Sequence, residues 1–156
     1  AVGASCKKHH FLSVTKQGLA AIVETKGNES CHLILRGSNK GPNFDDKSIA
    51  AVTDKLAEKK LRPSVMVDCS HGNSNKDHRK QPEVAANLAE HISSGSTAVF
   101  GVMLESHLVE GKQSYSNASA ATYGQSITDA CISWEEPEPI LDKLADAVRT
   151  RRAKAK

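Results

Sequence analysis

Short apolar runs and longer segments with apolar residues at helical spacing alternate along this chain, and the pair recurs four times. A short run is typical of a buried strand, and the spacing that follows it is typical of an amphipathic helix. The expected strands lie near Phe11–Val14, Cys31–Leu35, Ser64–Val67 and Thr97–Leu104. The expected helices are a segment from Lys16 through Val23, then Asp46–Lys59, a helix that Pro82 opens, and Pro137–Arg151. This alternation predicts an α/β fold in which helices cover a parallel sheet.

The size and charge of the chain exclude several classes of protein. With 156 residues, of which 38% are hydrophobic, the chain can bury one substantial core. No apolar run approaches the roughly 18 residues that a membrane-spanning helix needs, so we expect no membrane partner and a cytoplasmic location. The net charge is only +3 and aromatic residues make up 4% of the chain, so we expect no nucleic-acid partner.

The four cysteines are Cys6, Cys31, Cys69 and Cys131, and no two of them form a CxxC pair. Their scattered positions predict neither a disulfide framework nor a zinc site built from cysteines. We interpret each of them as a small, mostly buried residue.

Ionisable residues stand where the expected strands stop. Lys16, Arg36, His71 and Glu105 follow the four strands in turn, and Asp129 lies in the last loop. In parallel α/β folds, ligands bind at the carboxyl ends of the strands, which meet at one rim. The sequence therefore predicts one binding rim that carries all of these groups.

The residue types at this rim suit a metal ion and an anion, although each residue also has an ordinary explanation. His71, Glu105 and Asp129 offer one imidazole and two carboxylates, a set that suits Mn²⁺, Fe²⁺, Co²⁺ or Zn²⁺ better than Mg²⁺. Alternatively, the histidine caps a loop, the glutamate pairs with a lysine and the aspartate caps a turn. Arg36 can bind a phosphate or carboxylate through two parallel hydrogen bonds, or form a salt bridge with a neighbouring loop. The residues alone leave these alternatives open.

Five segments resemble one enzyme family in sequence, order and spacing. They read FLSVTK, GNESCHLILRG, VMVDCSHGNSNKDHRKQPEV, GVMLESHLVEGKQ and YGQSITDACISWE. Together they resemble the second half of type I 3-deoxy-D-arabino-heptulosonate 7-phosphate (DAHP) synthases in their microbial and fungal form, from about His10 to Arg152. Members of that family fold as (β/α)₈ barrels. The resemblance implies that residues 1–156 form a single partial domain, the carboxyl-terminal half of a barrel with strands five to eight and their helices.

The resemblance also implies an activity and roles for particular residues. The family condenses phosphoenolpyruvate with erythrose 4-phosphate in the first step of the shikimate pathway, which leads to the aromatic amino acids, and it uses a divalent metal. By position in the motifs, His71, Glu105 and Asp129 correspond to metal ligands, and His71 and Asp129 to catalytic residues. Arg36 and Asp129 correspond to substrate-binding residues.

Parts of the family's site have no counterpart in these residues. The fourth metal ligand of the family is a cysteine in a GPCS-type motif on an early strand, and several substrate-binding lysines and arginines also belong to the first half. Neither Cys69 nor Cys131 matches the position of that ligand. We therefore expect this chain to be inactive when it is isolated.

Family members are commonly inhibited by one aromatic amino acid that binds away from the active site. The corresponding residues here are Phe11, Ser13 and Val23. A serine at the third position of the FLSV strand resembles phenylalanine-sensitive members more than tyrosine-sensitive ones, so phenylalanine is the expected effector. The resemblance also implies that the full-length protein is a homo-oligomer.

Two other classes of function remain open. A metal-dependent phosphoester hydrolase could use a histidine and two carboxylates to activate water, without an aldehyde acceptor. A non-catalytic assembly module could use the apolar edge strands, expected at Phe11–Val14 and Thr97–Leu104, to bind partners.

Overall fold

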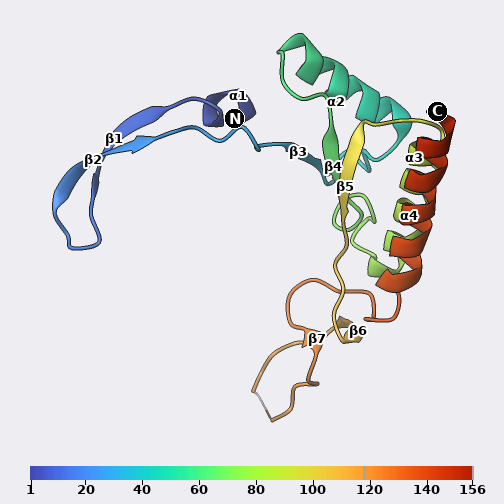
Figure 1. Ribbon diagram of the computed structural model, residues 1–156. Helices are drawn as coiled ribbons and strands as arrows, with labels where there is room; N and C mark the ends of the chain where they lie inside the picture. Colours follow the sequence, from blue (N-terminus) through green and yellow to red (C-terminus); the bar gives the residue numbers. More distant parts are fainter. Residues whose placement is uncertain (118, 156) are drawn as a thin grey trace. The chain divides into compact units, whose positions relative to one another are not determined.

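The structure is a computed structural model that describes residues 1–117 and 119–155 (Figure 1). The chain divides into two compact units, Ala1–Leu33 and Ile34–Lys156. Strands and helices alternate through most of the second unit, so the α/β class expected from the sequence is confirmed.

The first unit is a β-hairpin preceded by a short helix. The helix α1 (Val2–Ser5) comes first, followed by strands β1 (His9–Val14) and β2 (Ala20–Thr25). The two strands pair antiparallel, as Figure 1 shows. The first of the four expected strand–helix pairs therefore does not form.

The prediction of a helix from Lys16 through Val23 is wrong, and the local sequence explains why. Residues of β2 alternate between exposed and half-buried positions, which is the period of a strand. Ile22 and Val23 are β-branched and favour strands. Gly18 has a left-handed backbone with φ of +80° in the turn between the strands, a conformation that glycine adopts without strain.

A three-stranded sheet forms the centre of the α/β arrangement. Its strands lie in the order β3 (Leu33–Leu35), β4 (Val65–Asp68) and β5 (Val99–Met103). Strands β4 and β5 are parallel, with Asp68 opposite Met103 at their carboxyl ends. The edges of this sheet in the described residues are β3 and β5, so the expectation that residues 11–14 form one of its edges is wrong.

The three long helices lie within a few residues of their expected positions. They are α2 (Asp46–Glu58), α3 (Gln81–Ser93), which follows the short 3₁₀ helix η1 (His78–Lys80), and α4 (Pro137–Lys154). Helices α3 and α4 pack side by side (Figure 1). In the described ranges no helix is long and apolar enough to cross a lipid bilayer.

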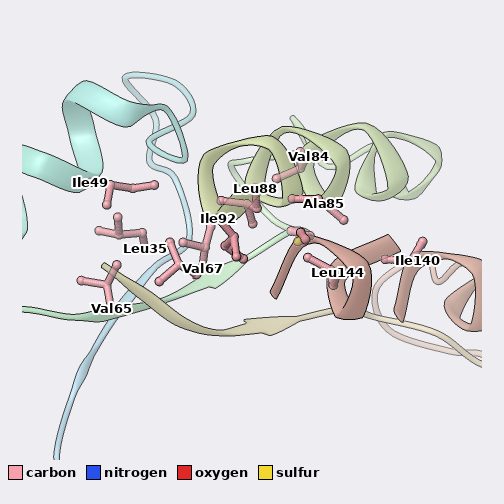
Figure 2. Close-up of a cluster of buried hydrophobic side chains, with 14 of the residues drawn as sticks. Leu35, Ile49, Val65, Val67, Val84, Ala85, Leu88, Ile92, Ile140 and Leu144 are labelled. Carbon is pink, nitrogen blue, oxygen red and sulfur yellow. The ribbon is translucent and has the colours of Figure 1, made fainter. Parts of the chain in front are cut away.

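The hydrophobic core lies between the sheet and these helices. In Figure 2, Leu88 and Ile92 lie on the side of α3 toward β4, which carries Val67. Leu88 is 0% exposed, and burying such a side chain stabilises the fold by about 1.5–3 kcal/mol. The buried apolar residues are Leu35, Ile49, Leu56, Val65, Val67, Cys69, Val84, Ala85, Leu88, Ala89, Ile92, Val99, Ile132, Ile140, Leu144 and Ala147.

A small second sheet organises the long polar loop that follows β5. Strand β6 (Val109–Lys112) pairs parallel with β7 (Gln125–Ser126). Isolated bridges join Ser106 to Ile132 and Gly111 to Cys131. The segment after β5 is thus tied to residues 131–132, close in sequence to Asp129.

Asp45 caps α2, and we expect its removal to weaken the fold in a pH-dependent way. Its carboxylate accepts hydrogen bonds from the Ser48 hydroxyl at 2.6 Å and the Ser48 backbone N–H at 3.0 Å. The hydroxyl first, and then the N–H, lower the pKa of Asp45. Asp45→Ala should lower the free energy of unfolding, measured by urea denaturation, by about 1 kcal/mol at neutral pH.

The sign of the pH effect follows from the lowered pKa. The charged cap contributes fully above the pKa of an unfolded aspartate, about 4, and its contribution is lost as the pH falls through the lower folded-state pKa. The difference between wild type and Asp45→Ala should therefore shrink in acid. The control Asp45→Asn keeps a neutral acceptor, so its difference from Asp45→Ala should vary little with pH. A wild-type advantage that is constant down to acid pH would contradict this role.

Candidate functional site

Three residues far apart in the sequence converge at the carboxyl end of the sheet. One ligand atom each from His71, Glu105 and Asp129 lies within 4.8 Å of the others. Nε2 of His71 is 3.6 Å from Oε1 of Glu105 and 3.8 Å from Oδ2 of Asp129. Ligand atoms that each lie about 2.1 Å from one ion can be at most about 4.2 Å apart. The separations around His71 therefore fit a shared metal ion.

His71 lies in a turn that directly follows β4. Its backbone is left-handed, with φ of +48°, which is uncommon for a residue other than glycine. Nδ1 of His71 is 2.7 Å from Oδ2 of Asp68, the last residue of β4. Nε2 faces Glu105 and Asp129, so the two ring nitrogens have different partners.

Glu105 follows β5 and is held at both its carboxylate and its backbone. The Ser70 hydroxyl donates to Oε2 of Glu105 at 2.5 Å. Gln81, the fully buried first residue of α3, accepts a hydrogen bond from the Glu105 N–H at 2.7 Å and donates one to the Glu105 carbonyl at 3.0 Å. The N–H of Ile132 also donates to this carbonyl, at 3.0 Å. Such contacts limit the movement of the carboxylate.

Asp129 is the most exposed member of the group. Its side chain is 67% exposed, compared with 23% for each of the other two. The loop that carries it is anchored nearby, where the N–H of Cys131 donates to the Gly111 carbonyl at 3.1 Å. The exposed carboxylate can contact a molecule that enters from solvent.

Arg36 and two lysines lie beside this group. The residues Arg36, Ser70, His71, Lys76, Glu105, Lys112, Asp129 and Ala130 line one hollow of about 370 Å³. Its three cationic side chains favour an anionic ligand next to the His71, Glu105 and Asp129 group. Lys16, in contrast, lies in the β1–β2 turn of the first unit, so the expectation that it follows a strand of the parallel sheet is wrong.

Asparagine side chains connect the turns that carry Arg36 and His71. Nδ2 of Asn73 donates to the carbonyl of Leu35 at 3.1 Å and to that of Asp68 at 2.8 Å. Oδ1 of Asn73 accepts from the N–H of Asn43 at 2.8 Å, and Oδ1 of Asn43 accepts from the N–H of Gly37 at 2.8 Å. The ends of β3 and β4 are therefore held together next to the hollow.

The two turns also touch through their main chains. Gly37 has φ of +75°, and a Cβ placed on it would lie 2.4 Å from the carbonyl carbon of Gly72. A Cβ on Gly72 would lie 2.8 Å from the carbonyl carbon of Gly37. Neither position can hold a larger residue without moving the backbone that carries Arg36 or His71.

The two nearby thiols, Cys69 and Cys131, both have raised pKa values. Burial, and then the negative charge of Asp68, raise the pKa of Cys69 to about 12. Burial is also the main cause of a raised pKa at Cys131. Among the described residues, the group of possible ligand atoms within 4.8 Å of one another consists of His71, Glu105 and Asp129 and includes neither cysteine.

The predicted effector residues lie on one face of the hairpin. Phe11 is directly opposite Val23, and Ser13 is two residues further along β1. Alternate residues of a strand share a face, so the three side chains form one patch. Phe11 is 49% exposed there.

Sequence reasoning missed Lys76, Lys112 and the residues that support the candidate ligands. Lys76 ends a run in which Asn75 and Lys76 both have positive φ, at +54° and +62°. Because Lys76 directly follows the residues HGNSN, which come after an expected strand, its position in the sequence could have indicated a place at the binding rim. Lys112 gave no signal, because it comes to the hollow only through the pairing of β6 with β7.

Comparisons with known proteins agree with one another. A model of the DAHP synthetase I family matches residues 1–142. The chain is 50% identical over 160 residues to the tyrosine-inhibited phospho-2-dehydro-3-deoxyheptonate aldolase of Schizosaccharomyces pombe, covering 100% of this chain and 43% of that protein. It is 49% identical over 152 residues to the Phe-sensitive enzyme of the same name from Escherichia coli K12, covering 97% of this chain and 43% of that protein.

A solved structure has the same fold. Phospho-2-dehydro-3-deoxyheptonate aldolase from Francisella tularensis SCHU S4 superposes with a TM-score of 0.90 and 47% sequence identity, covering 96% of this chain and 43% of that one. The chain thus spans less than half the length of the relatives that it matches.

Proposed function

This chain belongs to the DAHP synthetase I family, and we propose that it supplies the carboxyl-terminal part of a 3-deoxy-7-phosphoheptulonate synthase. That enzyme is a transferase of aromatic amino acid biosynthesis. It joins C3 of phosphoenolpyruvate to the aldehyde carbon of erythrose 4-phosphate and, with uptake of one water, releases phosphate. The observation that carries the proposal is the convergence of His71, Glu105 and Asp129 beside a cationic hollow.

We propose that residues 1–156 belong to one partial domain, the closing part of a (β/α)₈ barrel. The β3–β4–β5 sheet, with α2, α3 and α4, would contribute its consecutive strands and helices. A complete barrel takes about 250 residues, more than this chain contains. The 43% of the Francisella chain that is covered, at a TM-score of 0.90, supports this placement.

His71, Glu105 and Asp129 would hold a divalent metal such as Mn²⁺, Fe²⁺, Co²⁺ or Zn²⁺. One nitrogen and two carboxylate ligands are the basis for this choice of ions. When bound, the metal would supply Lewis acidity toward the aldehyde oxygen. Asp129 has a second carboxylate oxygen that can accept a hydrogen bond from a substrate hydroxyl, which would orient the sugar phosphate.

Arg36 would bind phosphoenolpyruvate, with Lys76 and Lys112 supplying further positive charge. A guanidinium matches a carboxylate or phosphate with two parallel hydrogen bonds and stays charged at every physiological pH. Because the turns of Arg36 and His71 are held together through Asn73, the anion would sit at a fixed distance from the candidate ligands. Fixed placement of both reactants favours their reaction.

The hairpin would serve regulation and assembly. Phe11, Ser13 and Val23 would contact an aromatic amino acid, and two relatives are named for inhibition by tyrosine or sensitivity to phenylalanine. On the opposite face, Leu12 is 84% exposed and Ile22, directly across from it, is 73% exposed. Exposed apolar pairs of this kind favour association, in line with a homo-oligomer when the protein is full length.

The metal ligands can be tested by substitution in the full-length protein. His71→Ala and Glu105→Gln should each abolish condensation activity and stoichiometric binding of divalent metal, because a missing ligand leaves the site incomplete. Metal analysis after dialysis measures the binding directly. Glu138→Gln, an exposed position at the start of α4, should leave metal content unchanged. Wild-type metal content in both ligand variants would refute the assignment.

The isolated chain should show no measurable condensation with both substrates and Mn²⁺. In the family, further cations and a thiolate ligand come from the first half of the protein. If each lost charge-assisted contact contributes about 1.5–3 kcal/mol, substrate binding weakens by several kcal/mol. Adding the first half in trans should restore some activity. Turnover by the chain alone, near that of an intact family enzyme, would overturn this expectation, and phosphate release without the aldehyde would favour a hydrolase.

Phenylalanine should inhibit the full-length enzyme more strongly than tyrosine or tryptophan. Phe11→Ala should weaken that inhibition with little change in uninhibited activity, since Phe11 belongs to the first unit and the candidate metal ligands belong to the second. His10→Ala changes a side chain on the other face of β1 and is the matched control. Phenylalanine should inhibit this variant as strongly as it inhibits the wild type. Steady-state inhibition curves measure the effect, and stronger inhibition by tyrosine would end the phenylalanine assignment.

A further inference from the structure

Asp68 is a buried carboxylate that the proposed ligand set does not include. It ends β4, and the residue is only 2% exposed. A charge in such a position requires partners, because burial removes it from water. Oδ1 of Asp68 accepts a hydrogen bond from the N–H of Ser70 at 2.8 Å, and Oδ2 lies 2.7 Å from Nδ1 of His71.

The contact with His71 has a consequence for the imidazole. An ionised carboxylate can only accept hydrogen bonds, so the 2.7 Å contact requires a proton on Nδ1 of His71. In the neutral ring the lone pair then lies on Nε2. Nε2 is the nitrogen that faces Glu105 at 3.6 Å and Asp129 at 3.8 Å.

We propose that Asp68 is a positioning residue, which fixes His71 in its Nδ1–H tautomer and thereby presents Nε2 as the ligand atom. The inference rests on the proposed metal function for its purpose, but its structural basis is the hydrogen bonding of Asp68 alone. A carboxylate that orients a histidine in this way also makes the imidazole a stronger ligand.

Both oxygens of Asp68 are needed as acceptors, which makes an isosteric test possible. Asparagine keeps the shape but offers one oxygen and one NH₂ group. In Asp68→Asn the NH₂ group must face either Nδ1 of His71 or the N–H of Ser70. The first arrangement places the ring proton on Nε2, which blocks the ligand atom. The second brings two donors together in a buried site and leaves both without an acceptor.

Asp77→Asn is the matched control. Asp77 lies nine residues further along the same polar segment and accepts a hydrogen bond from the N–H of Arg79 at 3.1 Å. The substitution removes a carboxylate of the same size, and no hydrogen bond or ion pair in the described part of the chain connects Asp77 to His71, Glu105 or Asp129. It therefore reports the effect of a lost charge in this segment without a change at the imidazole.

The tautomer can be read in the metal-free, full-length protein labelled with ¹⁵N at histidine. Long-range ¹H–¹⁵N correlation spectra distinguish a protonated Nδ1 from a protonated Nε2, and His71→Gln identifies the His71 signals by their loss. We expect the Nδ1–H form in the wild type and in Asp77→Asn, and a shift toward the Nε2–H form in Asp68→Asn. In calorimetric titrations with Mn²⁺, Asp68→Asn should bind about 10–100-fold more weakly than wild type.

The outcomes distinguish failure of the proposed role of Asp68 from failure of the proposed metal function. An Nε2–H form in the wild type, or an unchanged tautomer and Mn²⁺ affinity in Asp68→Asn, would overturn the role of Asp68. If Asp68→Asn does not fold, by circular dichroism, the wild-type spectrum still tests the tautomer. A wild type with the Nδ1–H form that binds none of Mn²⁺, Fe²⁺, Co²⁺ and Zn²⁺ would refute the proposed metal function while the role of Asp68 in setting the tautomer stands.

Discussion

The hydrogen bonds of Asn73 join the ends of β3 and β4, and the candidate site is built on that junction. Its NH₂ group donates to the carbonyl of Leu35, the last residue of β3, and to that of Asp68, the last residue of β4. Buried carbonyls of this kind must find donors, because an unpaired one costs about 1–3 kcal/mol. Arg36 comes directly after one of the joined strand ends, and the turn with His71 comes after the other. The need to pair buried backbone groups thus places a cation beside an imidazole.

The features that the sequence revealed are those with a local signature. Helices α2, α3 and α4 were predicted well because their apolar residues repeat with a helical period and prolines mark two of their starts. Arg36, His71 and Glu105 were expected at one rim because each follows an apolar strand, and the structure places all three around one hollow. The family named from the five motifs is confirmed by a match to residues 1–142. Asp129 lies in the last loop, and for it, as for the other three, the resemblance supplied the expected role.

The features that were missed depend on contacts between distant residues. Ser70 is 35 residues from Glu105 in the sequence, and Gln81 is 24 residues from it, so no local pattern connects them. The hairpin was mistaken for a strand and a helix because Lys16–Val23 is too short for a helical period to be distinguished from alternation. The antiparallel pairing with β1 shows that the end of this segment is a strand, because Val23 lies opposite Phe11 and Ile22 lies opposite Leu12. A two-stranded ribbon of this kind buries neither face by itself and needs other parts of a protein for stability.

The contact between Gly37 and Gly72 is made by main-chain atoms alone. Side chains can change rotamer or be exchanged during evolution, but two touching backbones leave no such freedom. The contact therefore fixes the distance between the turn that carries Arg36 and the turn that carries His71. Substitutions elsewhere around the hollow can alter which molecules enter it, while the spacing between the turns that carry Arg36 and His71 stays the same.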